Sequence, residues 1–446
     1  MTNLKKLSLA TLGLIIVAVI YSMTSGSAKL VSRAKSQVNT ELTMLQTQGF
    51  AIQNRETGEK NEHFIISFDD PEKIAAYFTQ HGAQLSVEDA KVFKGLQIGV
   101  DLHYLADTYS GISFDLYPVT LPKSITSSAT TPEDKDILKQ IEQMLEKKTF
   151  LIHCDINKLG TGFKGYMKDI DEVLKSDTTV KMVLSKLKFS GDIKDDKVQS
   201  IEQTLQSIHI DTDDTFNVTV TGVKSNYRIT GATLYDYKTD YSIEKITMQE
   251  KDTMMFVADH FEARSDSTVK NSLANTTLKT KVKSIVFNNK DNKVILDTLL
   301  LDMKADNLNM EALEALGKMD EGNEKAINET FQKLISKGIQ LEIPEFSVAS
   351  IENLGQKMGG FHLNTQLHIN KSLNIEALQQ NPLLALNAFN INLDLILSKE
   401  LYALIRQQPK AVIVMMLFHP KDVKGKKVYN VELKDGSLNV NGSPVM

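Results

Sequence analysis

The stretch FNVTV, residues 216–220, shows the pattern that decides the fold. Apolar and polar side chains alternate along it, which is the period of a strand with one buried and one solvated face. Comparable segments recur through residues 149–305 and predict a long antiparallel meander. They recur at no fixed spacing, so a solenoid of repeats is not predicted. The expected strands lie near 150–157, 160–168, 182–189, 206–211, 215–221, 226–234, 241–249, 253–260, 270–287 and 293–304.

Helical patterns flank the meander. The clearest begins with Thr131 as N-cap and Pro132 in the first turn. Further helices are expected at 309–319 and 324–337. The predicted fold class is therefore α+β: a predominantly antiparallel β meander with packed helices, preceded by one N-terminal transmembrane helix. The apolar stripe of the first helix consists of Ile137, Leu138, Ile141, Met144 and Leu145.

The transmembrane prediction rests on the uncharged apolar run of residues 7–23. At about 1.5 Å per residue the run spans roughly 25 Å, close to the roughly 30 Å of a hydrocarbon core. Lys5 and Lys6 precede it, so the positive-inside tendency places the N-terminus in the cytoplasm and the bulk of the chain across the membrane. A cleaved signal peptide is the alternative, because the small residues 26–28 suit cleavage. A buried core helix fits poorly with a terminal position beside lysines.

Changes of pattern along the chain suggest four regions. They are a membrane anchor or signal sequence at 1–28, an N-terminal α+β region at 29–131, a long antiparallel β region at 132–305 and a C-terminal α+β region at 306–446. Within the last region, residues 411–418 form an apolar run too short to cross a bilayer. The chain ends in a hairpin around Asp435-Gly436.

Composition limits the classes of partner. The chain has 446 residues, with 51 basic against 56 acidic side chains and a net charge of −5. An acidic balance argues against a nucleic-acid partner. The single cysteine, Cys154, precludes an internal disulfide and stands in an alternating run where a small buried residue is expected.

Patterns that carry chemistry are nearly absent. The sequence contains no nucleophile elbow, phosphate-binding loop, dinucleotide fingerprint or zinc-protease motif. His362 and His368 share a strand face but stand about 20 Å apart, too far to share a metal. We predict no catalytic, cofactor-binding or metal-binding residues, no cofactor and no enzymatic activity.

Three weaker candidates have ordinary interpretations. Asp211 to Asp214 begins like a calcium loop but lacks the required glycine and closing glutamate, so an acidic hairpin turn is expected. Asp169, Asp171 and Glu172 could act as paired acids, but charge is ordinary at a strand end. The pairs Met254-Met255 and Met415-Met416 suit either core packing or an adaptable apolar groove.

Three segments carry a resemblance to a known family. They are residues 113–118, SFDLYP; residues 334–343, LISKGIQLEI; and residues 429–442, YNVELKDGSLNVNG. In these the chain resembles the YdgA-like family of uncharacterised bacterial envelope proteins. The resemblance implies an inner-membrane anchor, a periplasmic β-rich body and self-association, and it transfers no active site.

Two hypotheses of function follow. The first is a membrane-anchored periplasmic binding scaffold, single-pass in the bacterial inner membrane through residues 7–23, that holds an apolar ligand such as a lipid on a curved β-sheet. The second is a structural or assembly protein of the envelope that acts through protein–protein contacts as a homodimer. In the second, the helices at 132–148 and 309–337 close the apolar sheet face and leave no cavity.

Overall fold

The computed structural model describes most of the chain and divides it into two units. Unit 1 is Met1–Ser225 and unit 2 is Asn226–Met446. The boundary falls within one strand, β11 (Phe216–Ile229). The described residues are 30–80, 85–176, 178–194, 197–213, 215–233, 235–251, 253–290, 292–316, 324–381, 385–408 and 418–445.

The predicted anchor, residues 7–23, lies outside the described residues, as do residues 411–417. Among the helices that are described, none has the length and apolarity needed to cross a membrane.

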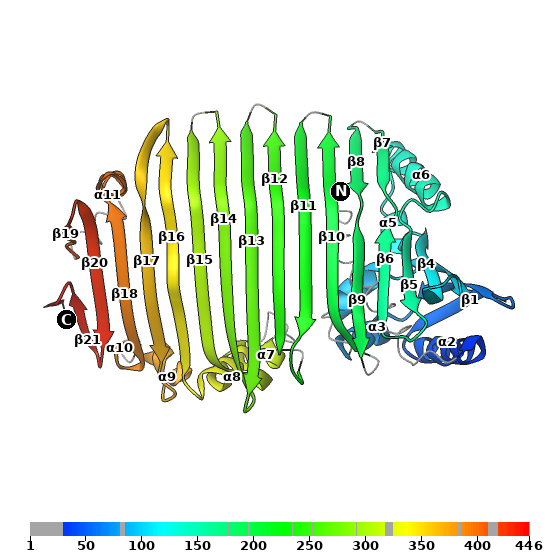
Figure 1. Cartoon of the computed structure of the whole chain (residues 1–446), viewed down its shortest axis with the longest axis horizontal. Helices are drawn as coiled ribbons and strands as arrows, with labels where there is room; N and C mark the ends of the chain where they lie inside the picture. The colour runs from blue at the N-terminus through cyan, green and yellow to red at the C-terminus, as the bar shows by residue number, and fades with distance from the viewer. Residues whose placement is uncertain are drawn as a thin grey trace. The chain divides into compact units, whose positions relative to one another are not determined.

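Unit 1 is built on an antiparallel sheet (Figure 1). Its neighbours run β1–β2–β3–β4–β5–β6–β9–β10, and β10 also pairs with β8, which pairs with β7. The strands are β1 Phe50–Thr57, β2 Asn61–Phe68, β3 Gln97–Tyr104, β4 Ser110–Thr120, β5 Ile152–Asn157, β6 Gly162–Met167, β7 Ile170–Leu174, β8 Val180–Ser185, β9 Lys188–Lys194 and β10 Lys197–Thr212.

Helices cover the apolar face of this sheet. Leu42 and Leu45 of α2 pack against Phe64, Val100 and Phe114 of the strands, and all five are buried. Burying side chains of this size contributes about 1.5–3 kcal/mol each. The helices are α2 Leu30–Thr47, α3 Pro71–Gln80, α4 Val87–Val92, α5 Lys123–Thr126 and α6 Pro132–Glu146.

Unit 2 is a meander of long antiparallel strands (Figure 1). Neighbours run in chain order from β12 to β18, and β20 then pairs with β18, β19 and β21. The strands are β12 Tyr237–Glu250, β13 Met254–Lys270, β14 Leu273–Asn289, β15 Lys293–Asn309, β16 Ile339–Asn353, β17 Gln356–Ile369, β18 Phe389–Ser398, β19 Lys421–Val423, β20 Lys426–Lys434, β21 Ser437–Val440 and β22 Ser443–Pro444. The helices are α7 Met310–Leu316, α8 Glu324–Ile335, α9 Ile375–Gln380, α10 Ala385–Ala388 and α11 Lys399–Ile405.

The sheet of unit 2 has one apolar and one charged face. Residues paired directly across strands point to the same side of a sheet. One such row on the apolar face is Phe261, Val282, Leu299, Val348, Phe361 and Leu397. Helix α8 packs on this face through Leu334 and Ile335, and α11 packs there through Leu401.

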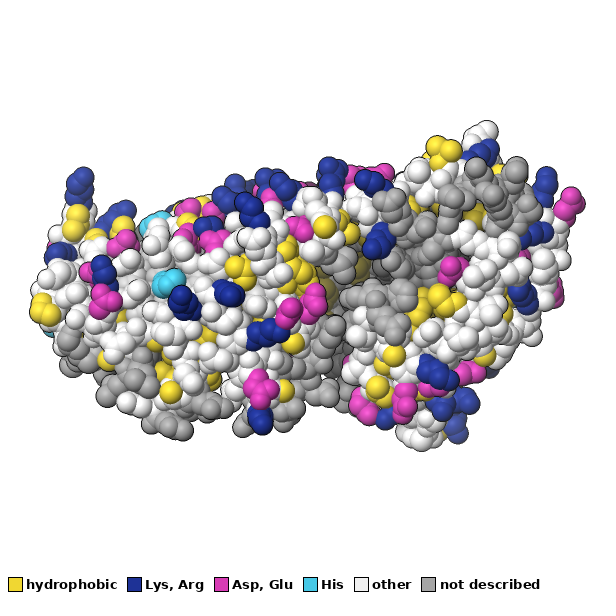
Figure 2. Space-filling model, turned by 90° about the horizontal axis from the view of Figure 1, so that it is seen from below, with side chains coloured by type: hydrophobic (Ala, Val, Ile, Leu, Met, Phe, Trp, Pro, Cys, Tyr) yellow, Lys and Arg dark blue, Asp and Glu magenta, His cyan; other side chains and the backbone are white. Residues whose placement is uncertain are grey.

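The opposite, charged face carries cross-strand ion pairs. Lys238 Nζ lies 2.9 Å from Asp266 Oδ2, and Lys279 Nζ lies 3.3 Å from Asp302 Oδ2. Charged side chains gather along the upper margin of the surface in Figure 2. The strand pairings confirm that the sheet is predominantly antiparallel, and these side chains give it an apolar and a polar side.

Several predicted details are confirmed. Thr131 caps α6 in a reciprocal capping box with Asp134, and Pro132 is the first helical residue. The final hairpin turns at Asp435 (φ 48°) and Gly436 (φ 80°), the left-handed pair that a tight two-residue turn requires.

Other predicted boundaries are wrong. The expected strand at 182–189 is two strands, β8 and β9, which separate at Lys186 (φ 52°). The expected strands at 215–221 and 226–234 are one strand, β11, which continues through Gly222 (φ 65°).

Candidate functional site

A cavity of about 260 Å³ lies in unit 1 between helices α5 and α6 and strands β7, β8 and β10. The described residues that line it all have apolar side chains. They are Phe93, Leu96, Pro118, Leu121, Pro122, Ile125, Ile141, Met144, Leu145, Phe150, Met167, Ile170, Leu174, Met182, Leu184, Ile208 and Ile210.

Strand periodicity builds one wall of the cavity. On β10, Ile208 and Ile210 alternate with polar residues, and on β8 Met182 and Leu184 likewise stand two positions apart. Ile208 pairs directly with Leu184, and Ile210 with Met182. Paired residues face the same side, so all four side chains form one apolar patch under the helix.

The helix provides the opposite wall. Ile141, Met144 and Leu145 of α6 lie three and four positions apart, so they share one helix face. Met144 and Leu145 are buried, whereas Ile141 is half-buried.

The cavity has a closed floor and a more open margin. Ile125, Met167 and Ile170 are at most 5 % exposed. Leu174, Met182 and Ile210 are only half-buried. An apolar molecule could therefore approach along the margin formed by β7, β8 and β10 and meet no described polar side chain inside.

One glutamine ties α6 to the sheet. Gln140 Nε2 donates to the carbonyl of Lys175 at 2.6 Å, and Gln140 Oε1 accepts from the Lys175 amide at 2.8 Å. Lys175 follows β7 directly, so the pair of bonds fixes the helix beside the half-buried margin of the cavity.

A charged cluster lies beyond the C-terminal end of α6. Lys148 Nζ donates to Asp101 Oδ2 at 2.8 Å, and its ammonium stands 3.7 Å from the centre of the Tyr117 ring. Burial raises the pKa of Asp101, but hydrogen bonds from Lys148 and His63 outweigh that effect and lower it. The cluster holds the segment after α6 to β3 and β4.

A second histidine on this sheet lies between two carboxylates. His153 Nδ1 lies 2.7 Å from Asp115 Oδ1, and its Nε2 lies 3.3 Å from Asp155 Oδ2. The hydrogen bond with Asp115 raises the pKa of His153 against the opposing effect of burial. Asp155 also accepts a hydrogen bond from Ser110 Oγ at 2.7 Å. These groups satisfy one another, so the arrangement is structural.

The residues singled out in the sequence are scattered. Cys154 is fully buried, as predicted, and burial raises the pKa of its thiol. Asp169 accepts from the Lys186 amide at 2.7 Å, and Glu172 accepts from Thr149 Oγ1 at 3.2 Å. Thus Asp169 and Glu172 fix loops.

The remaining candidates do not form a site either. His362 and His368 share β17, as predicted, and Met254-Met255 begin β13. Asp213 adopts a left-handed turn conformation (φ 43°), in keeping with the predicted acidic turn. Within the described residues, no group of three or more His, Cys, Asp or Glu side chains is placed to hold a metal ion.

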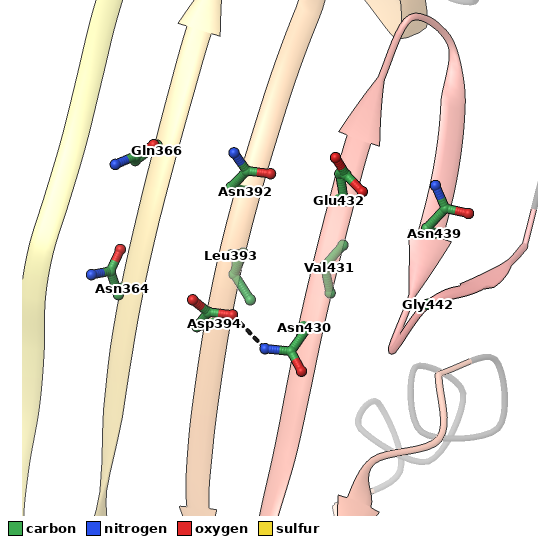
Figure 3. Close-up of a pocket in the computed structure, with 10 residues that line it drawn as sticks. All are labelled: Asn364, Gln366, Asn392, Leu393, Asp394, Asn430, Val431, Glu432, Asn439 and Gly442. Carbon is green, nitrogen blue, oxygen red and sulfur yellow. Dashed lines mark hydrogen bonds between the residues drawn. The ribbon is translucent and has the colours of Figure 1, made fainter.

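Unit 2 contains a hollow of a different kind. A space of about 480 Å³ lies over β17, β18, β20 and β21, and polar side chains stand around it (Figure 3). The described lining residues are Asn364, Gln366, Asn392, Leu393, Asp394, Asn430, Val431, Glu432, Asn439 and Gly442. Sequence reasoning missed this hollow and the cavity, because each draws on strands far apart in the chain.

The comparisons give a family. Residues 119–445 match the family model described as bacterial protein of unknown function (DUF945). No curated protein and no solved structure matches the chain. The matched segment includes α6, the strands beneath it and the polar hollow of unit 2. The chain therefore belongs to the bacterial family of unknown function DUF945.

Proposed function

We propose that this protein is a membrane-anchored periplasmic binding scaffold, without catalytic activity, that holds an apolar ligand such as a lipid acyl chain beneath α6. One observation carries the proposal: the described lining of the unit 1 cavity is entirely apolar. A polar ligand would leave its own hydrogen-bonding groups unsatisfied there, which costs roughly 1–3 kcal/mol for each group.

The volume limits what the cavity can hold. An apolar cavity of about 150 Å³ binds benzene, whereas pockets for drug-sized molecules have about 300–1,000 Å³. A cavity of about 260 Å³ therefore fits the end of an acyl chain better than a complete lipid. The rest of such a ligand would extend past the half-buried margin at Leu174, Met182 and Ile210.

The proposed location rests on the sequence. The apolar run at 7–23 and the lysines before it favour a single-pass inner-membrane anchor with the bulk of the chain in the periplasm. Membership of a bacterial family agrees with this. Within that family we propose that the chain belongs with the YdgA-like envelope proteins.

A second function deserves a test because unit 2 exposes large apolar side chains. Phe287, Met303 and Leu341 are 37 %, 43 % and 36 % exposed. Such side chains favour protein–protein contact, and hence the alternative of an envelope assembly protein that acts as a homodimer.

Native mass spectrometry of the full chain, followed by organic extraction, tests both proposals. Two variants place the same larger side chain on α6: Ile141→Phe fills the cavity, and Leu138→Phe is the matched control outside its lining. We expect an apolar molecule at fixed stoichiometry in the wild type and in Leu138→Phe, and a marked loss in Ile141→Phe. A wild-type protein without ligand would refute the binding scaffold, and a ligand-free dimer would favour assembly.

A further inference from the structure

We propose that the polar hollow of unit 2 is a binding site for a short saccharide that carries no negative charge. The site is separate from the apolar cavity, and its ligand is chemically different. The hollow measures about 480 Å³, and five of its ten described lining residues carry primary amides.

Strand pairing places the polar side chains in two rows. Asn364, Asp394 and Asn430 are direct cross-strand partners, and Asn430 donates to Asp394 (Figure 3). The next row on the same face is Gln366, Asn392, Glu432 and Asn439. Adjacent strands are about 4.8 Å apart and same-face residues along a strand about 7 Å apart. The rows therefore form a grid of hydrogen-bonding groups rather than a single point of contact.

The second row continues across the sheet, and its chemistry changes along the way. From β12 to β21 it reads Lys238, Asp266, Thr277, Lys304, Glu342, Gln366, Asn392, Glu432 and Asn439. Its first part is paired by charge: Lys238 with Asp266 at 2.9 Å, and Lys304 with Glu342 at 3.8 Å. Beyond Glu342 this row contains no Lys or Arg, and three of its four remaining side chains are primary amides.

The side chains in the amide part of the row are free of hydrogen bonds to other described protein groups. Within the described part of the chain, the side chains of Gln366, Asn392, Glu432 and Asn439 make no hydrogen bond or ion pair to another protein group. Their donors and acceptors are thus available to a ligand, unlike the ion-paired charges at the other end of the row.

The charges select the ligand class. Asp394 and Glu432 are acceptors only, and none of the described lining residues is Lys or Arg. A phosphate, carboxylate or nucleic acid would meet repulsion without a compensating cation. An apolar ligand would cover these polar groups without replacing their hydrogen bonds to water.

Hydroxyl groups can form hydrogen bonds with both the carboxylates and the primary amides of the hollow. A hydroxyl donates to a carboxylate and exchanges hydrogen bonds with an amide in either direction. A sugar ring presents several hydroxyls around one plane, as a grid on a sheet surface requires. Hydrogen bonds from hydroxyls to Asp394 and Glu432 would be charge-assisted and therefore the stronger ones.

Saturation-transfer NMR tests the site on the full chain, in a detergent without a sugar headgroup. The probes are maltotriose, cellotriose and triacetylchitotriose. We expect saturable binding of at least one, weakened about tenfold or more by Asn392→Ala and by Glu432→Gln. The matched control is Gln356→Ala, which removes an exposed amide from β17 outside the hollow and should leave binding unchanged.

The remaining outcomes overturn the proposal. The proposal fails if no probe binds, or if Asn392→Ala and Glu432→Gln leave binding unchanged. It also fails if Glu432 binds calcium and the loss of that ion explains the effect of Glu432→Gln. Circular dichroism of each variant separates a lost site from a lost fold. Because Asn392 and Glu432 are exposed, both variants are expected to fold.

Discussion

The hollows of the two units differ in what surrounds them and in what they can hold. In unit 1, α6 covers alternating apolar residues of β8 and β10, and the space left between them is lined by apolar side chains. In unit 2, the hollow lies on the polar side of the sheet, over β17 to β21. Both arrangements follow from the two-residue period of a β-strand, which sends alternate side chains to opposite faces of the sheet. The difference shows that residue type on a chosen strand face decides the polarity of the space beside it.

The largest expected effect comes from placing one carboxylate in each hollow. Leu184→Asp puts an unpaired carboxylate in a wall that is 3 % exposed, and we expect it to lower the free energy of unfolding by at least about 3 kcal/mol. Asn392→Asp puts the same group on an exposed site and should change stability by less than about 0.5 kcal/mol.

Urea unfolding followed by circular dichroism measures both variants, since the chain has no tryptophan. The loss in Leu184→Asp should shrink at low pH, where the new carboxyl group is protonated. Equal losses in the two variants would mean that the two hollows do not differ in polarity as described.

A second comparison sets the cavity against the packed core of the same unit. Phe114 is fully buried in the core cluster, and Phe114→Ala should cost about 3–5 kcal/mol. Met144 is 4 % exposed but borders the cavity, so some of its contacts are already missing. Met144→Ala should therefore cost about 2 kcal/mol, the low end of the usual range.

The same unfolding measurement decides this comparison. If Met144→Ala cost as much as Phe114→Ala, the space beneath α6 would behave as packed core. When variant and wild type are both measured with added apolar ligand, the difference from the wild type should shrink for Met144→Ala and stay the same for Phe114→Ala, because only Met144 lines the cavity.

Sequence reasoning predicted most of the sheet and failed where a break carried no local signal. The β8–β9 break falls at Lys186, a left-handed residue that is neither Gly nor Asn, between Leu184 and Leu187. Residues 182–189 therefore looked like one continuous strand. The opposite error lies at residues 222–225, which were expected to separate two strands, whereas β11 continues through the left-handed Gly222.

Neither the cavity of unit 1 nor the hollow of unit 2 could be predicted from the sequence, for a related reason. The lining of the cavity runs from Phe93 to Ile210, and that of the hollow from Asn364 to Gly442. Each set is brought together by strand register, and register depends on where each turn lies. The apolar stripe of α6 was predicted, but not the strands that it faces.

A smaller expected effect is a change in the free energy of unfolding with pH. The pKa of His153 is raised in the folded state, chiefly by the hydrogen bond with Asp115. The stabilisation is therefore complete below the unfolded pKa of about 6.5 and is lost as pH rises through the folded pKa. Wild-type stability should fall in that window by on the order of 1 kcal/mol.

His153→Gln should remove this dependence on pH, as measured by urea unfolding at several pH values between about 5 and 9. The matched control is His103→Gln, an exposed histidine on β3 of the same sheet. An unchanged pH profile in His153→Gln would show that the pair with Asp115 does not stabilise the fold. Saccharide binding in unit 2 should not follow this titration, which sharpens the contrast between the two sites.

The smallest expected effect tests whether α6 can move as a cover of the cavity. Gln140→Ala removes both hydrogen bonds to Lys175 and should cost about 1 kcal/mol at this half-buried position. Gln143→Ala, on the same helix but with no side-chain hydrogen bond in the described structure, is the matched control. Hydrogen exchange of α6 should accelerate in Gln140→Ala alone, since the two hydrogen bonds to Lys175 limit local opening of the helix. Exchange of apolar ligand should accelerate with it, whereas saccharide exchange in unit 2 should not. Faster helix opening without faster ligand exchange would mean that the ligand enters along β7, β8 and β10 without displacement of the helix.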